Sequence, residues 1–574
     1  MPVHDQPSPQ VSRRVLLKLA GLSGAALPAA LAALPGGVLR ALAAPPAPPS
    51  APGAWGPLSP IDGDRDALPH AHISGDDPAE AHKALWDPEG VLRERGLSAL
   101  PAPSERVKVL VVGGGVAGLT AAWRLRAHAP VVLERAARLG GNAKGEVWGG
   151  LPYSIGAAYL IGPEVGSEME AHLKELGALA QCRVAPHSPM IRAGVRHDDF
   201  KARDWGTPAQ MEAWRRLKGR LKAVYAGEGG HIFPNLPTDD AAHRALVNKL
   251  DAVTFRDYLR EAAGGELPQE LALYLEHYCW SAFGAGSHEL SAASGLNFLA
   301  AEEGAVLVAP GGNAGVADAL YRQLAAALPP SALRVKSLVF DVRASAQGAQ
   351  VAYVDAGGAV RVIEAEAVVM ACPKFVVKRV VRDLEPARLA AIERLKYRAY
   401  LVANALFEAP LKDDFYASYL LTDGRPTDDA MADSARDGST DISYGNFARM
   451  DERRSTLTLY YPLPFDAGRG QVLGQPDLSA ARARFERELK ESVMPALKLA
   501  PESLKGLRLT RWGHPLPVAA PGLVAEGVVD ALRAPFGGRV FFAQQDNWGL
   551  PAFEVATQEA WRAARQVEEL LKGG

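Results

Sequence analysis

The sequence predicts an α/β fold built around a Rossmann-like unit, and the main observation is a strand, turn and helix pattern near residue 107. A β-branched apolar run over residues 107–112 ends abruptly in glycines and passes into a helix-forming segment. Gly113, Gly115 and Gly118 have the G-x-G-x-x-G spacing, which permits a tight turn, close approach to a pyrophosphate and close packing of helix on strand. We expect a bound dinucleotide to contact Gly113, Gly115, Ala117 and Gly118.

A second apolar strand supports this interpretation. The predicted strand at residues 131–133 is followed directly by Glu134, about 20 residues after Gly113. An acidic side chain at this spacing can hydrogen-bond the ribose of a dinucleotide. The alternative is an ordinary glycine-rich turn, which accounts for the glycines but not for a strand and an acid at this spacing.

The length, charge and cysteine content of the chain exclude several classes of function. The chain has 574 residues, enough for two large units with appendages, and 48% of them are hydrophobic, as in a globular protein. A formal net charge of −2 without a long basic run argues against nucleic acid as a partner. The three cysteines have no metal-binding spacing, so we predict no metal site and no disulfide framework.

The beginning of the chain resembles a twin-arginine export signal. Arg13 and Arg14 directly precede the apolar stretch 19–34, which is too short and too rich in proline and glycine to be a good membrane span. A small-x-small pattern ending at Ala43 predicts cleavage there, which would remove residues 1–43. We therefore expect a periplasmic or otherwise exported protein that uses the twin-arginine machinery. An uncleaved anchor or a mitochondrial presequence is the alternative.

Residues 44–105 are predicted to be a tether and an N-terminal arm. Proline recurs seven times between residues 44 and 60, which favours an extended chain over packed structure. Residues 61–104 contain one short helical pattern near 78–86, and nothing in them predicts a function.

Two further segments indicate which dinucleotide binds. Arg135 follows the ribose acid, Gly140 and Gly141 come soon after, and a second run of small residues ends at Tyr159. Backbone without large side chains can lie against a long ligand and close to a flat ring. These residues resemble the FAD-dependent amine oxidase superfamily. The resemblance implies FAD contacts at Glu134, Arg135, Gly140, Gly141, Asn142, Gly156, Ala157, Ala158 and Tyr159.

The resemblance also implies that the FAD-binding domain is assembled from discontinuous segments. It assigns residues 106–165, 301–373 and 511–574 to this domain. Residues 166–300 and 374–510 would form an inserted α+β substrate domain over the flavin ring.

The later FAD-binding segments supply further predicted contacts. Residues 310–315 lead into a helix and strands that cover the adenine in the family, where Leu338 would make an apolar contact; a β-meander without a ligand is the alternative. A strand over 539–543 precedes Asp546, which best matches the family's acid near the ribityl chain and the pyrimidine edge. The helix that begins at Phe553 would present backbone N–H groups to the reduced ring.

The candidate catalytic residues are Trp548, His514 and Phe553. Trp548 lies where the family often places aromatic rings that flank the substrate amine, although a core tryptophan is the alternative. His514 lies in a predicted loop whose R-W-x-H element looks like one in exported polyamine dehydrogenases of the superfamily, although it could be a hydrogen-bonded structural histidine. Phe553 begins the helix beside Trp548.

Two departures from the family affect the expected chemistry. The strand at 401–405 lacks the lysine that holds a water at flavin N5 in many of these enzymes, and no cysteine lies near the C-terminus for covalent attachment. We therefore expect non-covalent FAD. Oxygen, a quinone or a redox protein remain open as the electron acceptor.

These features predict an exported FAD-dependent oxidoreductase that oxidises a C–N bond of an amine or polyamine by hydride transfer to flavin. Two alternatives stay open. A desaturase or isomerase of carotenoid or porphyrinogen type would use the same scaffold with an apolar tunnel. A flavin-binding electron-transfer partner would have no substrate of its own.

Overall fold

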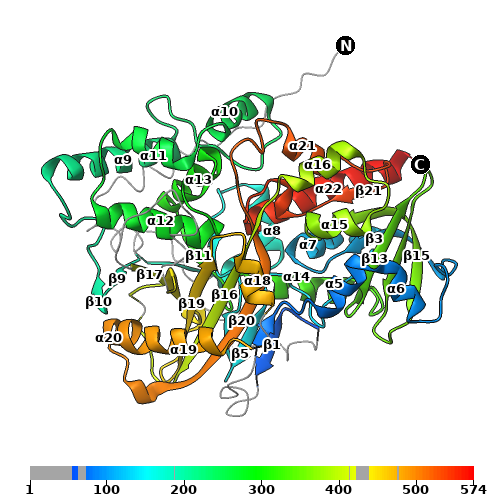
Figure 1. Ribbon diagram of the computed structural model, residues 1–574, viewed down its shortest axis with the longest axis horizontal. Helices are drawn as coiled ribbons and strands as arrows, with labels where there is room; N and C mark the ends of the chain where they lie inside the picture. Colours follow the sequence, from blue (N-terminus) through cyan, green and yellow to red (C-terminus); the bar gives the residue numbers. More distant parts are fainter. Residues whose placement is uncertain are drawn as a thin grey trace, which may run out of the picture.

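Two large sheets with helices packed around them make up the described part of the chain (Figure 1). The computed structural model describes residues 55–61, 73–186, 188–412, 414–421, 438–474 and 477–573. The predicted export signal, residues 1–43, lies outside the described residues. No helix within these ranges has both the length and the apolar character needed to cross a membrane.

The first sheet has seven strands in the order β12-β4-β3-β15-β14-β13, with β21 paired to β15. They are β3 (Glu105–Val112), β4 (Val131–Leu133), β12 (Leu333–Arg334), β13 (Leu338–Ala344), β14 (Ala349–Val354), β15 (Val360–Met370) and β21 (Val540–Phe542). Met370 pairs in parallel with both Val112 and Phe542. Three separated chain segments therefore build one largely parallel sheet, which confirms the predicted α/β fold class with a discontinuous Rossmann-like unit.

Strand β3 is apolar along its second half because the sheet is covered on both faces. Val109 and Val111 pack against α7 (Val116–Arg124), α14 (Asn313–Ala327) and α22 (Phe553–Gly573), the last drawn in red in Figure 1. Leu110 and Val112 face a second core that reaches the helical group described below. An unbroken run of apolar residues is the pattern that two-sided burial requires.

The second sheet has eight strands in the order β10-β9-β17-β18-β19-β16-β20-β2. Its strands are β2 (Ile73–Gly75), β9 (Met190–Arg192), β10 (Val195–His197), β16 (Tyr397–Phe407), β17 (Ala417–Leu421), β18 (Asp441–Tyr444), β19 (Ser455–Leu463) and β20 (Leu504–Pro517). Every residue of β16 is buried, because β16 lies between β19 and β20 and is covered on both faces. The helix α19 (Ser479–Glu488) contributes Phe485 to the core on one of these faces.

Strand β20 corrects the prediction of a loop around His514. The pairing of β20 with β16 skips from Trp512 to Leu516, so the three residues between them form a bulge. Pro515 has no N–H to donate to a ladder and is suited to a bulge. Residues 511–517 therefore belong to the eight-stranded sheet, not to the Rossmann-like unit.

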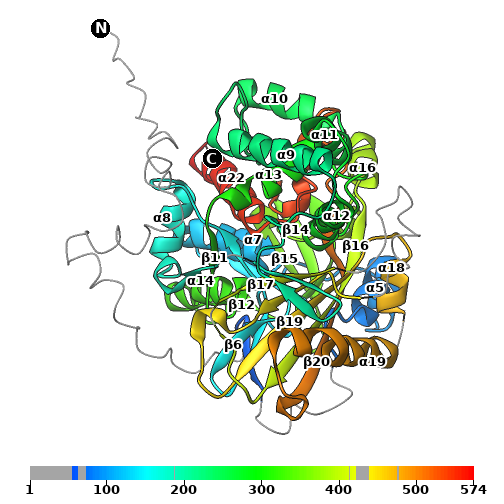
Figure 2. The same ribbon diagram turned by 90° about the vertical axis from the view of Figure 1, so that its left-hand side faces the viewer.

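Six helices lie between residues 168 and 299 in the described part of the chain, and they confirm the predicted helical character of residues 166–300. They are α8 (Glu168–Glu175), α9 (Pro208–Ala226), α10 (Ala241–Asp251), α11 (Phe255–Ala263), α12 (Gln269–Phe283) and α13 (Ala292–Leu299). Figure 2 shows α9 to α13 at the top and α19 at the bottom, with the sheets between them. Helix α12 is apolar on most sides because it is enclosed by other helices and by β17 and β19.

Shorter elements complete the structure. They are β5 (Gly145–Trp148), β6 (Leu151–Ser154), β7 (Leu160–Ile161), β8 (Arg183–Val184), β11 (Val306–Val308), α15 (Lys374–Val380), α16 (Pro386–Glu393), α18 (Gly468–Leu473), α20 (Met494–Leu497) and α21 (Val528–Arg533). Strands β7, β11 and β8 form a small antiparallel sheet beside the cofactor-binding segments.

The predicted tether is partly folded. β1 (Leu58–Ile61) pairs in parallel with β5, and Leu58 and Ile61 are buried. An extended, unpacked chain is therefore the wrong description of residues 58–60, because apolar residues between the prolines find a strand edge to pair with. The predicted short helix is confirmed as α5 (Ala79–Trp86), which is followed by α6 (Pro88–Arg93).

Candidate active site

One cavity of about 790 Å³ is lined by residues of both the Rossmann-like unit and the eight-stranded sheet. The predicted residues on its wall are Gly113, Gly115, Ala117, Glu134, Arg135, Gly140, Gly141, Asn142, Gly156, Ala157, Ala158, Tyr159, Leu338, His514 and Phe553. Three predicted site residues are not on the wall: Gly118, Asp546 and Trp548. The structure thus brings together segments that the sequence separates by more than 400 residues, counted from Gly113 to Phe553.

The glycines of the first turn have distinct roles. A Cβ at Gly113 would lie 2.5 Å from the Ala371 carbonyl oxygen, and a Cβ at Gly118 would lie 1.9 Å from the Gly113 carbonyl oxygen. These two positions need glycine for packing within the protein. A Cβ at Gly115 would meet only Gly141, at an ordinary 3.5 Å, and would otherwise enter the cavity. The protein itself leaves this position open, which fits the close approach of a ligand.

Glu134 is held in a fixed orientation at the end of β4. Its Oε2 accepts a hydrogen bond of 2.7 Å from the Gly114 amide, and its Oε1 accepts one of 2.8 Å from the Ala136 amide. Each carboxylate oxygen keeps a second lone pair. Because Glu134 lies on the cavity wall, these lone pairs are suited to ribose hydroxyls, as predicted.

The second cofactor segment folds back on itself beside the cavity. The Ala157 amide donates to the Asn142 carbonyl over 3.2 Å, and a Cβ at Gly156 would lie 2.2 Å from that same oxygen. The Asn142 side chain donates to the Pro515 carbonyl over 3.2 Å. The predicted small-residue runs therefore lie side by side, and the bulge of β20 rests against them.

Asp546 does not have the predicted position at the cofactor. Its carboxylate is 0% exposed and accepts hydrogen bonds of 2.6 Å from the Lys374 amide and 2.6 Å from the Tyr397 hydroxyl. The Lys374 ammonium lies 3.3 Å away and also contacts Asn547. The strand β21 ends in a 3-10 turn that points Asp546 into the protein, and Gln544 and Gln545 line the cavity instead.

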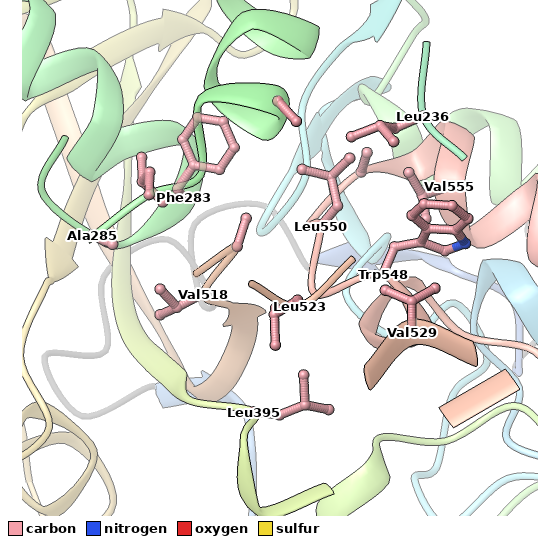
Figure 3. Close-up of a cluster of buried hydrophobic side chains, with 14 of the residues drawn as sticks. Leu236, Phe283, Ala285, Leu395, Val518, Leu523, Val529, Trp548, Leu550 and Val555 are labelled. Carbon is pink, nitrogen blue, oxygen red and sulfur yellow. The ribbon is translucent and has the colours of Figure 1, made fainter. Parts of the chain in front are cut away.

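Trp548 is a core residue and not a flank of the substrate. It is 2% exposed and packs with Val529 and Val555, as Figure 3 shows. Its indole N–H donates to Glu559 over 3.0 Å. The prediction is wrong because the turn that contains Asp546 also directs Trp548 inward, where Glu559 satisfies its only donor.

His514 reaches the cavity as a neutral side chain. Its ring lies 4.4 Å from the Phe375 ring, centroid to centroid, and burial lowers the pKa of His514 to about 4. At neutral pH the imidazole therefore carries no charge and can neither attract an anion nor repel an ammonium group.

The sequence reasoning missed the polar groups of the substrate side. Asp441, Glu302, Tyr400, Tyr416 and Tyr460 line the same cavity as the glycine turn. Burial raises the pKa of Asp441 to about 6, and burial also raises the pKa of Glu302. Asp441 accepts a hydrogen bond of 2.6 Å from Thr440, and no ion pair joins it to a cation among the described residues.

The tyrosines connect the substrate side to the second cofactor segment. The Tyr460 hydroxyl donates to the Gly156 carbonyl over 3.1 Å, and the Tyr416 hydroxyl donates to the Ala158 carbonyl over 3.0 Å. These bonds fix the two rings against the run of small residues. A polar, tyrosine-rich compartment therefore adjoins the predicted place of the flavin ring.

The residues present fit an FAD molecule. A glycine turn with an open position at Gly115, a fixed carboxylate at the predicted ribose position, and one cavity lined by both of these and by aromatic rings fit the parts of this cofactor. The family model for flavin-containing amine oxidoreductases matches residues 116–568. The chain belongs to this family and is an FAD-dependent oxidoreductase.

Comparisons with individual proteins agree with this assignment. The chain is 22% identical to oxidoreductase PigB of Serratia sp. (strain ATCC 39006) over 533 residues, which are 83% of this chain and 77% of that protein. A segment of 91 residues, 15% of this chain, is 36% identical to 18% of human peroxisomal N(1)-acetyl-spermine/spermidine oxidase.

Solved structures share the fold. Putrescine oxidase bound to putrescine has a TM-score of 0.59 at 17% identity, covering 81% of this chain and 99% of that one. Cyclohexylamine oxidase from Brevibacterium oxydans IH-35A has a TM-score of 0.57 at 18% identity, with the same two coverages of 81% and 99%.

Proposed function

We propose that this protein oxidises a C–N bond of an amine or polyamine by transfer of a hydride equivalent to FAD. One observation carries the proposal. The cavity lined by the glycine turn is also lined by the carboxyl group of Asp441 and by tyrosine rings, with no cation paired to that carboxyl in the described structure. An ammonium group fits a carboxylate beside aromatic faces.

The names of related proteins support an amine as the substrate. The proteins of known structure with the same fold include oxidases of putrescine and cyclohexylamine, and the segment match is to an oxidase of acetylated spermine and spermidine. Apolar surface without a charged group would favour the desaturase or isomerase alternative, and the presence of Asp441 and Glu302 on the cavity wall favours an amine.

The chain's own residues would bind and orient the substrate. When bound, FAD supplies the acceptor for the hydride equivalent. Asp441 attracts a protonated nitrogen, and the rings of Tyr416 and Tyr460 restrict where the carbon next to the reacting nitrogen can lie. Neutral His514 adds no competing charge to the cavity wall. Few groups need to move protons, which agrees with a cavity that contains no histidine and carboxylate pair at hydrogen-bond distance among the described residues.

Anaerobic reduction of the flavin tests the proposal. Polyamines, monoamines and amino acids are mixed one by one with the FAD-loaded protein, and loss of the oxidised flavin absorbance is recorded. We expect at least one amine to bleach the flavin. Bleaching by a polyene or porphyrinogen alone would favour the desaturase or isomerase alternative. Bleaching by none of these compounds would favour an electron-transfer partner.

Asp441→Asn should weaken amine binding and remove its pH dependence. The Asp441 carboxyl is neutral below its pKa of about 6 and charged above it, so apparent amine affinity in the unaltered protein should rise as the pH rises from 5 to 7. In Asp441→Asn we expect an apparent Kd about tenfold higher at pH 7, with a flatter profile. Flavin reduction titrated with amine at each pH measures both quantities. An unchanged Kd at pH 7 would remove Asp441 from the substrate site.

We also propose that the protein is exported through the twin-arginine route. Support comes from Arg13 and Arg14, from the apolar stretch 19–34 that follows them, and from Ala43 at a small-x-small site. Replacing both arginines with lysine should leave the full-length chain inside the cell. Fractionation with an antibody against the chain checks this, and the N-terminal sequence of the exported form tests cleavage after Ala43. Export of the lysine variant at the normal level would contradict the route.

A further inference from the structure

The N-terminal arm, defined here as residues 55–61 and 73–86, lies against the cofactor cavity although it precedes the residues that match the family model. It contains no motif that predicts a ligand. Nevertheless five of its residues line the cavity: Asp76, Pro78, Ala81, His82 and Leu85.

The first part of the arm holds the segment that carries the glycine pair. The Leu139 amide donates to the Trp55 carbonyl over 2.9 Å, and the Gly145 amide donates to the Pro57 carbonyl over 3.0 Å. The Arg138 guanidinium also donates to Pro57, over 3.1 Å. These contacts lie on both sides of Gly140 and Gly141, so the arm fixes the backbone that faces the cavity at this point.

The second part of the arm connects the two large sheets through Asp76. The Asp76 carboxylate accepts from the Arg135 guanidinium over 3.0 Å and from the Gly513 amide over 2.9 Å. Arg135 follows the ribose acid Glu134, whereas Gly513 belongs to the bulge of β20. Strand β2 adds to this connection by pairing in parallel with β20.

Helix α5 covers the cavity next to the predicted adenine contact. Its buried residue Ala84 packs with Phe340 of β13, and Trp86 stacks on the Arg379 guanidinium at 3.6 Å. Figure 1 draws α5 and α6 in blue beside β13 and β15. With the helix held in this way, Ala81 and Leu85 line the same cavity as Leu338.

We propose that the N-terminal arm is part of the cofactor site: it covers the adenosine end of FAD and keeps the bound cofactor from leaving. The ligand class is the ADP portion of the dinucleotide. The arm acts on retention of FAD and not on the oxidised substrate, so this proposal is independent of the identity of the amine. Asp76 is a positioning residue: its carboxylate accepts hydrogen bonds from Arg135 and from the Gly513 amide and so holds the N-terminal arm against the cavity.

The first test measures release of FAD from Asp76→Ala. Loss of two charge-assisted hydrogen bonds should free the arm and speed FAD release about tenfold. Flavin fluorescence after dilution into an excess of a tighter flavin-binding apoprotein gives the rate. Glu89→Ala removes one exposed carboxylate of α6 that pairs with Arg93 away from the cavity, and it should release FAD at the native rate. Native release from Asp76→Ala would overturn the proposal.

The second test does not depend on the stability of that variant. Ala81→Cys and Lys83→Cys place thiols on one helix, at a position on the cavity wall and at a position off it. Bound FAD should slow maleimide labelling of Ala81→Cys at least severalfold and leave Lys83→Cys unchanged, with the three native cysteines measured on the unaltered chain as background. Equal labelling of Ala81→Cys with and without FAD would overturn the proposal.

Discussion

Gly118→Ala should prevent formation of the cofactor-binding unit, whereas Gly115→Ala should give a folded protein that no longer retains FAD. The Cβ added at Gly118 would lie 1.9 Å from a backbone oxygen, and backbone at the start of a buried helix cannot move away without breaking its packing. The Cβ added at Gly115 would instead occupy space in the cavity, where the protein presents no atom closer than 3.5 Å.

The two variants are compared by thermal unfolding and by the ratio of flavin to protein absorbance. We expect Gly118→Ala to be insoluble or to lose about 3 kcal/mol or more of unfolding free energy. We expect Gly115→Ala to unfold like the apoprotein and to contain little flavin after gel filtration. Full flavin content in Gly115→Ala would show that the pyrophosphate does not lie against this residue.

Lys374→Met should destabilise the protein by about 3–5 kcal/mol, because it leaves the Asp546 carboxylate buried without its cation. Lys374 is 1% exposed, and Asp546 is fully buried beside it. The remaining partners of Asp546 are the amide of residue 374 and the Tyr397 hydroxyl, neither of which carries a positive charge. Chemical unfolding of the variant and of the unaltered protein, both loaded with FAD, measures the loss.

A second substitution separates a structural role of Asp546 from a cofactor role. Combining Lys374→Met with Asp546→Asn removes both charges and should restore most of the lost stability, with FAD content unchanged. If Asp546→Asn alone keeps normal stability but loses FAD, then the predicted contact of Asp546 with the flavin holds and the buried ion pair is not its main role.

Local sequence patterns were sufficient for the first half of the site. The glycine turn, Glu134 and the small-residue runs each combine a residue type with a spacing that only a few backbone shapes satisfy. Such signals do not depend on what packs against them. The structure accordingly brings Gly115, Glu134 and Gly156 to one cavity wall, although their contact with FAD stays a prediction.

The direction of side chains near the C-terminus could not be predicted in this way. Trp548 and Asp546 lie in a short turn whose orientation depends on Glu559 and Lys374, and Lys374 is more than 170 residues away in the sequence. A residue's identity indicates what it can bond to, but here distant partners decide which way it faces. The same reason applies to His514, whose bulge is defined by the register with β16.

The place of Asp441 on the cavity wall was not predicted, although a local signal existed. Strand β18 alternates, with Asp441 and Ser443 on the cavity wall and Ile442 and Tyr444 in the core. This period of two predicts a half-buried strand. The strand has only four residues and follows an aspartate-rich stretch, so its alternation is easily read as part of a solvated loop.

The pairing of Met370 with both Val112 and Phe542 has a consequence for synthesis of the chain. During translation, β3 and β15 can pair early, but the edge of β15 at residues 368–370 stays open until β21 has been synthesised. Strand pairing over such long separations is slow and leaves exposed edges meanwhile. Strand β21 therefore closes this part of the edge late, and a chain truncated before Val540 would keep residues 368–370 unpaired on that side.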